Sequence, residues 1–184
     1  MADKIVEEDL ENIAQAIKAE AKVLEGKTLL ITGGSGFIGS YFVATIDILN
    51  KKHFKKPCRV ISLDNHIVGK SNNLIKEISS EHVKYIEHDV TKPFETKEPI
   101  DYIVSAAGVA SPVYYKKYPI QTIEGTIFGL KNALELCREK KSKSILFFSS
   151  SEIYGDPDPY FIPTPETYKG NVSSIGDRSC YDES

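Results

Sequence analysis

The chain has 184 residues, enough for one domain with a buried core and too few for two ordinary domains. Apolar residues make up 41% and charged residues 27%, a balance typical of a folded protein rather than a disordered one. The 23 basic and 26 acidic side chains give a formal net charge of −3, and no patch of basic residues with interleaved aromatics occurs. Nothing therefore favours nucleic acid as a partner.

The cysteines and the lengths of the apolar runs indicate where in the cell the protein is expected. Cys58, Cys137 and Cys180 are odd in number, far apart and without a C-x-x-C pair, which argues against a disulfide framework and a zinc site. No apolar run reaches the roughly 18 residues that a membrane span needs. The acidic start of the chain lacks the apolar region of a signal peptide. We expect a cytoplasmic protein with no metal site and no membrane partner.

Apolar side chains recur every three or four residues over residues 4–25, which predicts one amphipathic helix. The stripe consists of Val6, Leu10, Ile13, Ile17, Ala21 and Leu24. Gly26 then ends the helix. We expect residues 1–26 to form a helical appendage whose stripe packs on the following domain rather than on another protein.

Short apolar runs alternate with helical patterns along residues 27–184. The expected strands are Lys27–Thr32, Arg59–Leu63, Val83–Glu87, Asp101–Ser105 and Ser144–Ser149. They are apolar nearly throughout, as strands buried on both faces are. The expected helices are Gly36–Leu49, Ser71–Ile78 and Lys117–Arg138. This alternation predicts an α/β fold, a Rossmann-type doubly wound parallel sheet with right-handed crossovers.

The first expected strand runs through a glycine turn into a helix, with the sequence Thr32-Gly33-Gly34-Ser35-Gly36-Phe37-Ile38-Gly39. Glycines permit the tight turn, let backbone N–H groups approach a pyrophosphate, and let the helix pack close to the strand. The helix N-terminus adds partial positive charge that faces the phosphates. The strand before the turn and the helix after it favour a dinucleotide site over an ordinary glycine turn.

An acidic residue at the end of the second expected strand indicates which dinucleotide the site would bind. Asp64 lies 25 residues after Gly39, where a carboxylate accepts hydrogen bonds from the adenosine ribose. Asp64 would repel a 2′-phosphate, and its neighbours Asn65 and His66 offer no arginine to hold one. The expected cofactor is therefore NAD rather than NADP.

Two further strand ends are candidates for the cofactor site. Asp89 follows the third expected strand and is either a solvated acid or, with Val90, part of the adenine edge. Ala106 and Ala107 follow the fourth strand, and their small size would let the backbone approach the middle of the cofactor.

These motifs resemble the extended short-chain dehydrogenase/reductases, the NAD-dependent epimerase/dehydratase group. Three stretches are most similar to its UDP-glucuronate decarboxylase branch: Ala110-Ser111-Pro112 with Tyr114 or Tyr115 behind it, Ser151-Glu152-Ile153-Tyr154-Gly155-Asp156-Pro157, and Gly170-Asn171-Val172 running on to Arg178-Ser179-Cys180-Tyr181-Asp182-Glu183. The resemblance covers roughly residues 27–184.

The resemblance implies catalytic roles for Tyr181, Ser150 and Glu152. Tyr181 stands at the tyrosine of the family's Tyr-x-x-x-Lys signature and would take the proton of the sugar 4-hydroxyl, with Ser150 orienting that hydroxyl. Hydride transfer from C4 to NAD then gives a 4-keto sugar, and NAD is recycled. Glu152 would take part in acid–base chemistry rather than act as a surface acid.

The resemblance also implies a substrate site and an assembly. Ser111, Tyr115 and Ser151 would border the sugar, while Arg178 would either meet an anionic group of the substrate or be a solvated charge. Members of the family form homodimers through helices. The signature lysine would fall one residue after Ser184, so the chain resembles a truncated member without its substrate lobe. We expect an incomplete Rossmann domain with little or no turnover alone.

Three functions remain open at this point. The first is decarboxylation of UDP-glucuronate to UDP-xylose, and the second is a nucleotide-sugar 4,6-dehydratase or 4-epimerase. The third is a non-catalytic dinucleotide-binding protein. The joint presence of Tyr181, Ser150 and Glu152 favours an enzyme that acts on a nucleotide sugar.

Overall fold

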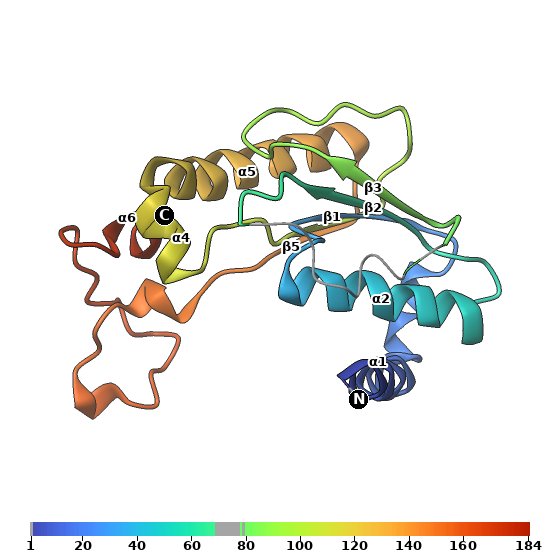
Figure 1. Ribbon diagram of the computed structural model, residues 1–184, viewed down its shortest axis with the longest axis horizontal. Helices are drawn as coiled ribbons and strands as arrows, with labels where there is room; N and C mark the ends of the chain where they lie inside the picture. The colour runs from blue at the N-terminus through green and yellow to red at the C-terminus, as the bar shows by residue number, and fades with distance from the viewer. Residues whose placement is uncertain (1, 69–77, 79) are drawn as a thin grey trace.

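A five-stranded parallel sheet forms the centre of the computed structural model, which describes residues 2–68, 78 and 80–184 (Figure 1). The strands lie in the order β3-β2-β1-β4-β5, with every neighbouring pair parallel. Their bounds are β1 Thr28–Thr32, β2 Arg59–Asp64, β3 Val83–Glu87, β4 Tyr102–Ser105 and β5 Ser144–Phe147. The strand order turns back at β1, so a topological switch point lies between β1 and β4. The Rossmann-type fold is thus confirmed.

Helices cover both faces of the sheet. α2 (Phe37–Lys52) lies on one face and α5 (Pro119–Lys140) on the other (Figure 1). Because side chains alternate along a strand, Leu29 and Ile31 of β1 join the core under α2, and Leu30 joins the core under α5. Burial on both faces explains why β1 reads as a continuous apolar run.

The two edge strands differ from the expectation that all strands are buried on both faces. In β5, Leu146 is 51% exposed and Phe147 39% exposed, and in β3 Tyr85 is 37% exposed. In the described part of the chain each edge strand has a neighbouring strand on one side only, so some of its apolar side chains stay exposed even though α5 contacts β5. The apolar pattern does not distinguish an edge strand from a central one.

The N-terminal region forms two helices rather than the single one expected over residues 4–25. α1 (Ala2–Ile17) ends before a short 3-10 helix, η1 (Glu20–Leu24), which leads into β1. α1 packs on α2, with Leu10 and Ala14 buried, so the stripe does contact its own domain. Ile13 and Ile17 instead border an apolar groove of about 410 Å³ between α1, α2 and β4.

The expected helix Lys117–Arg138 is also divided. The structure has α4 (Pro112–Lys117) and α5, separated by Tyr118 at φ −127° and ψ 56°. The physical reason is Pro119, because a residue that precedes proline is disfavoured in helical conformation. The expected helix Ser71–Ile78 lies outside the described residues, apart from Ile78.

After β5 the chain forms a closed loop and returns to α5. It passes through η2 (Ser151–Tyr154) and η3 (Pro159–Phe161) and reaches α6 (Ser179–Asp182), which packs on α5. The Asn171 N–H donates to the Tyr154 carbonyl at 2.9 Å, and the Asp156 N–H donates to the Asn171 carbonyl at 3.2 Å. These bonds close the base of a loop that projects from the body (Figure 1).

In the described part of the chain, no helix combines the length and apolar character that crossing a membrane requires.

Candidate functional site

The glycine turn lies where β1 ends and α2 begins, at the switch point of the sheet. Gly33 has φ +73°, and a Cβ there would lie 2.6 Å from the Ala106 carbonyl oxygen, so only glycine fits. The Gly33 N–H donates to the Leu63 carbonyl at 2.8 Å, and the Gly36 N–H donates to Gly33 at 3.0 Å. α2 then starts at Phe37, next to this turn, and the first N–H groups of a helix have no partner within the helix and favour a negatively charged ligand.

Asp64 fixes the glycine turn against the end of β2. Its Oδ2 accepts the Ser35 N–H at 3.0 Å and its Oδ1 accepts the His66 N–H at 2.8 Å. Each carboxylate oxygen has a further lone pair, so Asp64 can still accept a hydroxyl from a ribose. The sequence predicted the ribose contact but not this support of the turn.

Thr32 joins the ends of β1 and β4, a role that the sequence pattern did not indicate. Its buried hydroxyl oxygen accepts the N–H groups of Ala106 and Ala107, at 3.1 and 3.2 Å. These bonds hold the small residues of β4 close to Gly33.

Two cavities meet at the glycine turn. The first, which we call the carboxylate cavity, has about 190 Å³ and is lined by Asp64, Asp89, Glu124 and residues around them. The second, which we call the tyrosine cavity, has about 480 Å³ and is lined by Tyr181, Ser150, Glu152 and residues around them. The cavities share the residues Gly33, Gly36, Ala106, Ala107 and Gly108. The chain thus builds one continuous site over the turn.

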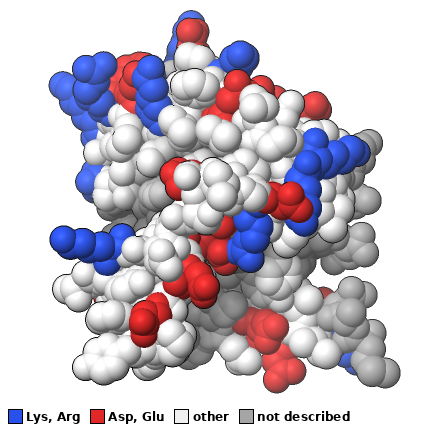
Figure 2. All heavy atoms as spheres, turned by 90° about the vertical axis from the view of Figure 1, so that its left-hand side faces the viewer, with Lys and Arg blue, Asp and Glu red and all other residues white. Residues whose placement is uncertain are grey.

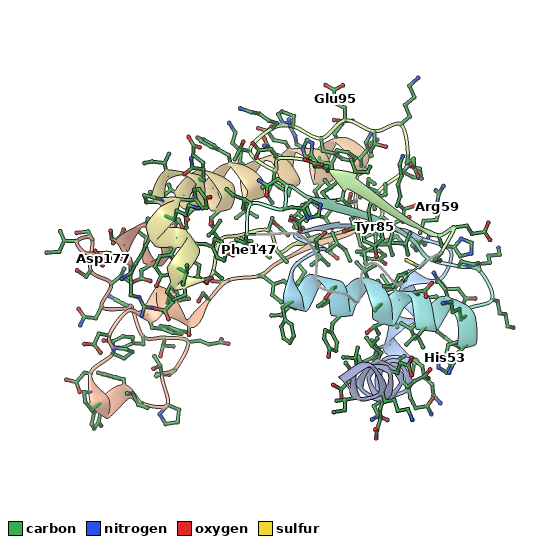
Figure 3. The ribbon with its side chains drawn as sticks, in the orientation of Figure 1. His53, Arg59, Tyr85, Glu95, Phe147 and Asp177 are labelled. Carbon is green, nitrogen blue, oxygen red and sulfur yellow. The ribbon has the colours of Figure 1, made fainter. Side chains whose placement is uncertain are left out.

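The tyrosine cavity brings the three predicted catalytic residues together. The ring of Tyr181, on α6, stacks on Tyr115 with centroids 5.4 Å apart and planes 12° apart. Ser150 caps η2, where its hydroxyl oxygen accepts the Glu152 N–H at 3.3 Å. Phe147, labelled in Figure 3, lies where β5 leaves the sheet and also lines this cavity.

Arg178 lies between two carboxylates. Its guanidinium donates a hydrogen bond to Glu152, and its Nε lies 3.7 Å from the Asp182 carboxylate. The hydrogen bond to Glu152 and the charge of that carboxylate, followed by that of Asp182, raise the pKa of Arg178. The arginine thus orients Glu152 in this structure.

The three predicted catalytic residues line the tyrosine cavity. The predicted cofactor residues each line one or both cavities; they are Gly33, Gly36, Phe37, Ile38, Gly39, Asp64, Asn65, Asp89, Val90, Ala106 and Ala107. The four predicted substrate residues line neither. The carbonyl of Ser111 accepts the N–H groups of Tyr114 and Tyr115 in α4, and Ser151 is exposed on η2. Tyr115 is buried behind Tyr181, and Arg178 pairs with Glu152.

Several cavity residues were missed by sequence reasoning. α5 contributes Gln121, Glu124 and Gly125 to the carboxylate cavity and Thr126 to the tyrosine cavity. Farther along α5, the Asn132 amide donates to the Val90 carbonyl at 2.8 Å, which holds the chain after β3 against the helix. The only signal was a group of polar and small residues at the start of an otherwise amphipathic helix.

The described residues contain no group of three or more His, Cys, Asp or Glu side chains that could hold a metal ion. All three cysteines are free, and Cys58 is buried.

A parallel sheet with a glycine turn at its switch point and a carboxylate at the end of β2 defines a dinucleotide-binding α/β protein. The model of the family described as NAD dependent epimerase/dehydratase matches residues 29–184. The chain therefore belongs to this family of extended short-chain dehydrogenase/reductases, whose cofactor is NAD.

Within this family, the chain is similar to several curated UDP-glucuronic acid decarboxylases. The chain is 43% identical over 155 residues to UDP-glucuronic acid decarboxylase 5 of Arabidopsis thaliana, which covers 84% of this chain and 42% of that protein. It is 37% identical over 157 residues to UDP-glucuronic acid decarboxylase 1 of Xenopus tropicalis, covering 85% of this chain and 34% of that protein. The chain thus spans less than half the length of these relatives.

Solved structures share the fold. The UDP-N-acetylglucosamine 4-epimerase of Methanobrevibacter ruminantium superposes with a TM-score of 0.64 at 24% identity, over 86% of this chain and 47% of that one. The dTDP-glucose 4,6-dehydratase of Streptomyces venezuelae, solved with NAD bound, gives a TM-score of 0.64 at 20% identity, over 85% of this chain and 47% of that one.

Proposed function

We propose that this chain is the cofactor-binding part of an NAD-dependent enzyme that modifies a nucleotide sugar through a 4-keto intermediate. UDP-glucuronate decarboxylation is the reaction we favour, because the curated relatives at 37–43% identity are UDP-glucuronic acid decarboxylases. The observation that carries the proposal is that Tyr181, Ser150 and Glu152 line one cavity, which continues into the cavity at the glycine turn.

The glycine turn is built to accept NAD, because its packing leaves no room for side chains at Gly33 and the first turn of α2 faces the same edge. NAD, when bound, supplies a reversible store for hydride. Asp64 would hydrogen-bond to the adenosine ribose, and Asp89 and Val90 would border the adenine.

Tyr181 would accept the proton of the sugar 4-hydroxyl, since its ring is fixed by Tyr115 at the wall of the tyrosine cavity. The oxygen of Ser150 accepts the Glu152 N–H, which leaves the Ser150 hydroxyl proton free to orient the same sugar oxygen. Glu152, which is hydrogen-bonded to Arg178, would act as an acid or base toward the sugar. A carboxylate β to the resulting ketone leaves as carbon dioxide, with its electrons held in an enolate.

The test is to incubate the complete product of the coding sequence that contains this chain with NAD and a panel of nucleotide sugars, then weigh the products. Loss of carbon dioxide from UDP-glucuronate is the expected result. Loss of water from a nucleotide hexose would instead assign a 4,6-dehydratase, and an isomer of unchanged mass a 4-epimerase. No product from any sugar would favour a non-catalytic NAD-binding protein.

We also propose that the complete protein is a homodimer formed through α5, in the cytoplasm. Ile120, Ile127 and Leu134 are 60%, 49% and 49% exposed and recur every seven residues, so they form one apolar stripe on the helix surface. Ile127→Asp should convert a dimer into a monomer in analytical ultracentrifugation, whereas Tyr160→Asp in the projecting loop should not. A wild-type protein that stays monomeric at micromolar concentration contradicts this proposal.

A further inference from the structure

The carboxylate cavity carries negative charge from three separate elements. Asp64 ends β2, Asp89 follows β3, and Glu124 comes from the second turn of α5. Among the described residues that line the cavity there is no lysine or arginine to balance them. Figure 2 looks onto this side of the molecule, where acidic side chains lie interspersed with lysines and arginines.

The three carboxylates differ in what holds them. Asp64 accepts two backbone N–H groups, and Asp89 accepts the Thr91 N–H at 3.0 Å. No hydrogen bond or ion pair joins the Glu124 carboxylate to another side chain or backbone group of the described chain. Within the described part of the chain, the Glu124 carboxylate is therefore without a compensating cation, and it presents only acceptor atoms to a ligand in the cavity.

A dinucleotide brings two phosphates to this site, so a free carboxylate on its wall opposes binding unless it accepts a hydrogen bond from the ligand. NAD has such donors in its ribose hydroxyls and adenine amino group. A 2′-phosphorylated dinucleotide replaces one hydroxyl donor by a dianion, and that dianion interacts unfavourably with every uncompensated carboxylate nearby.

We propose that Glu124 is a second determinant of cofactor choice, which acts with Asp64 to exclude the 2′-phosphate from the carboxylate cavity. The inference rests on the NAD-dependent function proposed above. It differs from the ribose contact of Asp64 because Glu124 acts from the helix side and through its charge.

The test compares NADH and NADPH binding to wild type, Glu124→Gln and Glu135→Gln. Because the chain has no tryptophan, the emission of the reduced nicotinamide itself is followed in the titration. Glu124→Gln keeps the size of the side chain and an acceptor oxygen but removes the charge. Glu135→Gln removes the same charge from an exposed site about three turns, or about 16 Å, farther along α5.

We expect Glu124→Gln to reduce the ratio of the NADPH and NADH dissociation constants by about fivefold, chiefly by tightening NADPH, while Glu135→Gln leaves the ratio unchanged. Added salt should reduce the difference in this ratio between wild type and Glu124→Gln, because salt screens interactions between charges but does not weaken direct packing contacts.

The inference would be overturned if Glu124→Gln left the ratio of the two dissociation constants unchanged, whether both affinities stayed the same or both fell equally. A wild-type chain that binds neither nucleotide would overturn the cofactor site itself, and with it the proposed function, so the two failures are distinguishable.

Discussion

Single glycines decide the shape of the cofactor edge. Gly33 has φ +73° and no space for a Cβ, whereas a Cβ at Gly125, inside α5, would meet no atom within 4 Å. Gly33→Ala should therefore lower the free energy of unfolding by about 1–3 kcal/mol and weaken NADH binding. Gly125→Ala should raise the free energy of unfolding by about 0.5–1 kcal/mol. Urea denaturation measures both, and a Gly33→Ala variant as stable as wild type contradicts the geometry.

Cys58 should be the least reactive thiol. Burial, followed by the charge of Asp101, raises the pKa of Cys58 to about 12. At pH 8 we expect Cys137 and Cys180, which are less buried, to react with iodoacetamide about a thousandfold faster, as followed by mass spectrometry of the intact and digested chain. Modification of Cys58 at the rate of the others in the folded chain would contradict its burial.

The same shift gives a pH dependence with a definite sign. The folded state keeps the Cys58 proton up to a pKa of about 12, whereas the unfolded thiol loses it near the ordinary cysteine pKa of 9.0. The contribution is fully present below about pH 9 and is lost as the pH rises toward 12. The free energy of unfolding should therefore fall over this window, and it should fall less in Cys58→Ala.

The glycine turn and Asp64 could be predicted because each lies within a few residues of a strand end, where the chemistry is local in sequence. Glu124 and Thr32 could not, because their roles depend on which elements the fold places together. Tyr115 shows the same limit, since the sequence alone did not indicate that its buried ring stacks on Tyr181.

At the scale of elements, α1 should contribute to stability although it precedes the part matched by the family model. Leu10 is 6% exposed where α1 packs on α2, and Ile5 on the same helix is 60% exposed. Leu10→Ala should lower the free energy of unfolding by about 2–4 kcal/mol, and Ile5→Ala should change it by less than about 0.5 kcal/mol. Equal effects of both variants in urea denaturation would contradict the packing of α1.

The central strands were predicted well because burial on two faces requires continuous apolar runs, and α2 was predicted well because the glycine turn precedes its first residue. The helix boundary at Tyr118 was missed although Pro119 indicates it. The exposure of β3 and β5 could not be predicted, because it depends on their position at the edges of the sheet.

At the scale of the whole molecule, one edge of the sheet combines two functions. The carboxylate cavity and the tyrosine cavity share residues of the glycine turn, so the proposed function places one dinucleotide across both, from the side of Asp64 toward the wall that carries Tyr181. A separate apolar groove lies between α1 and α2, and it shares only Ile38 with this site. We therefore expect NAD to bind in the joined cavities and not in the groove.

The most direct test is an NMR titration of the ¹⁵N-labelled chain with NAD. We expect amide shifts to change around Gly36, Asp64 and Ala107 and to extend to Tyr181, while Ile13 and Ile17 stay constant. Shift changes confined to the groove of α1 and α2, or no change at millimolar NAD, would contradict the account.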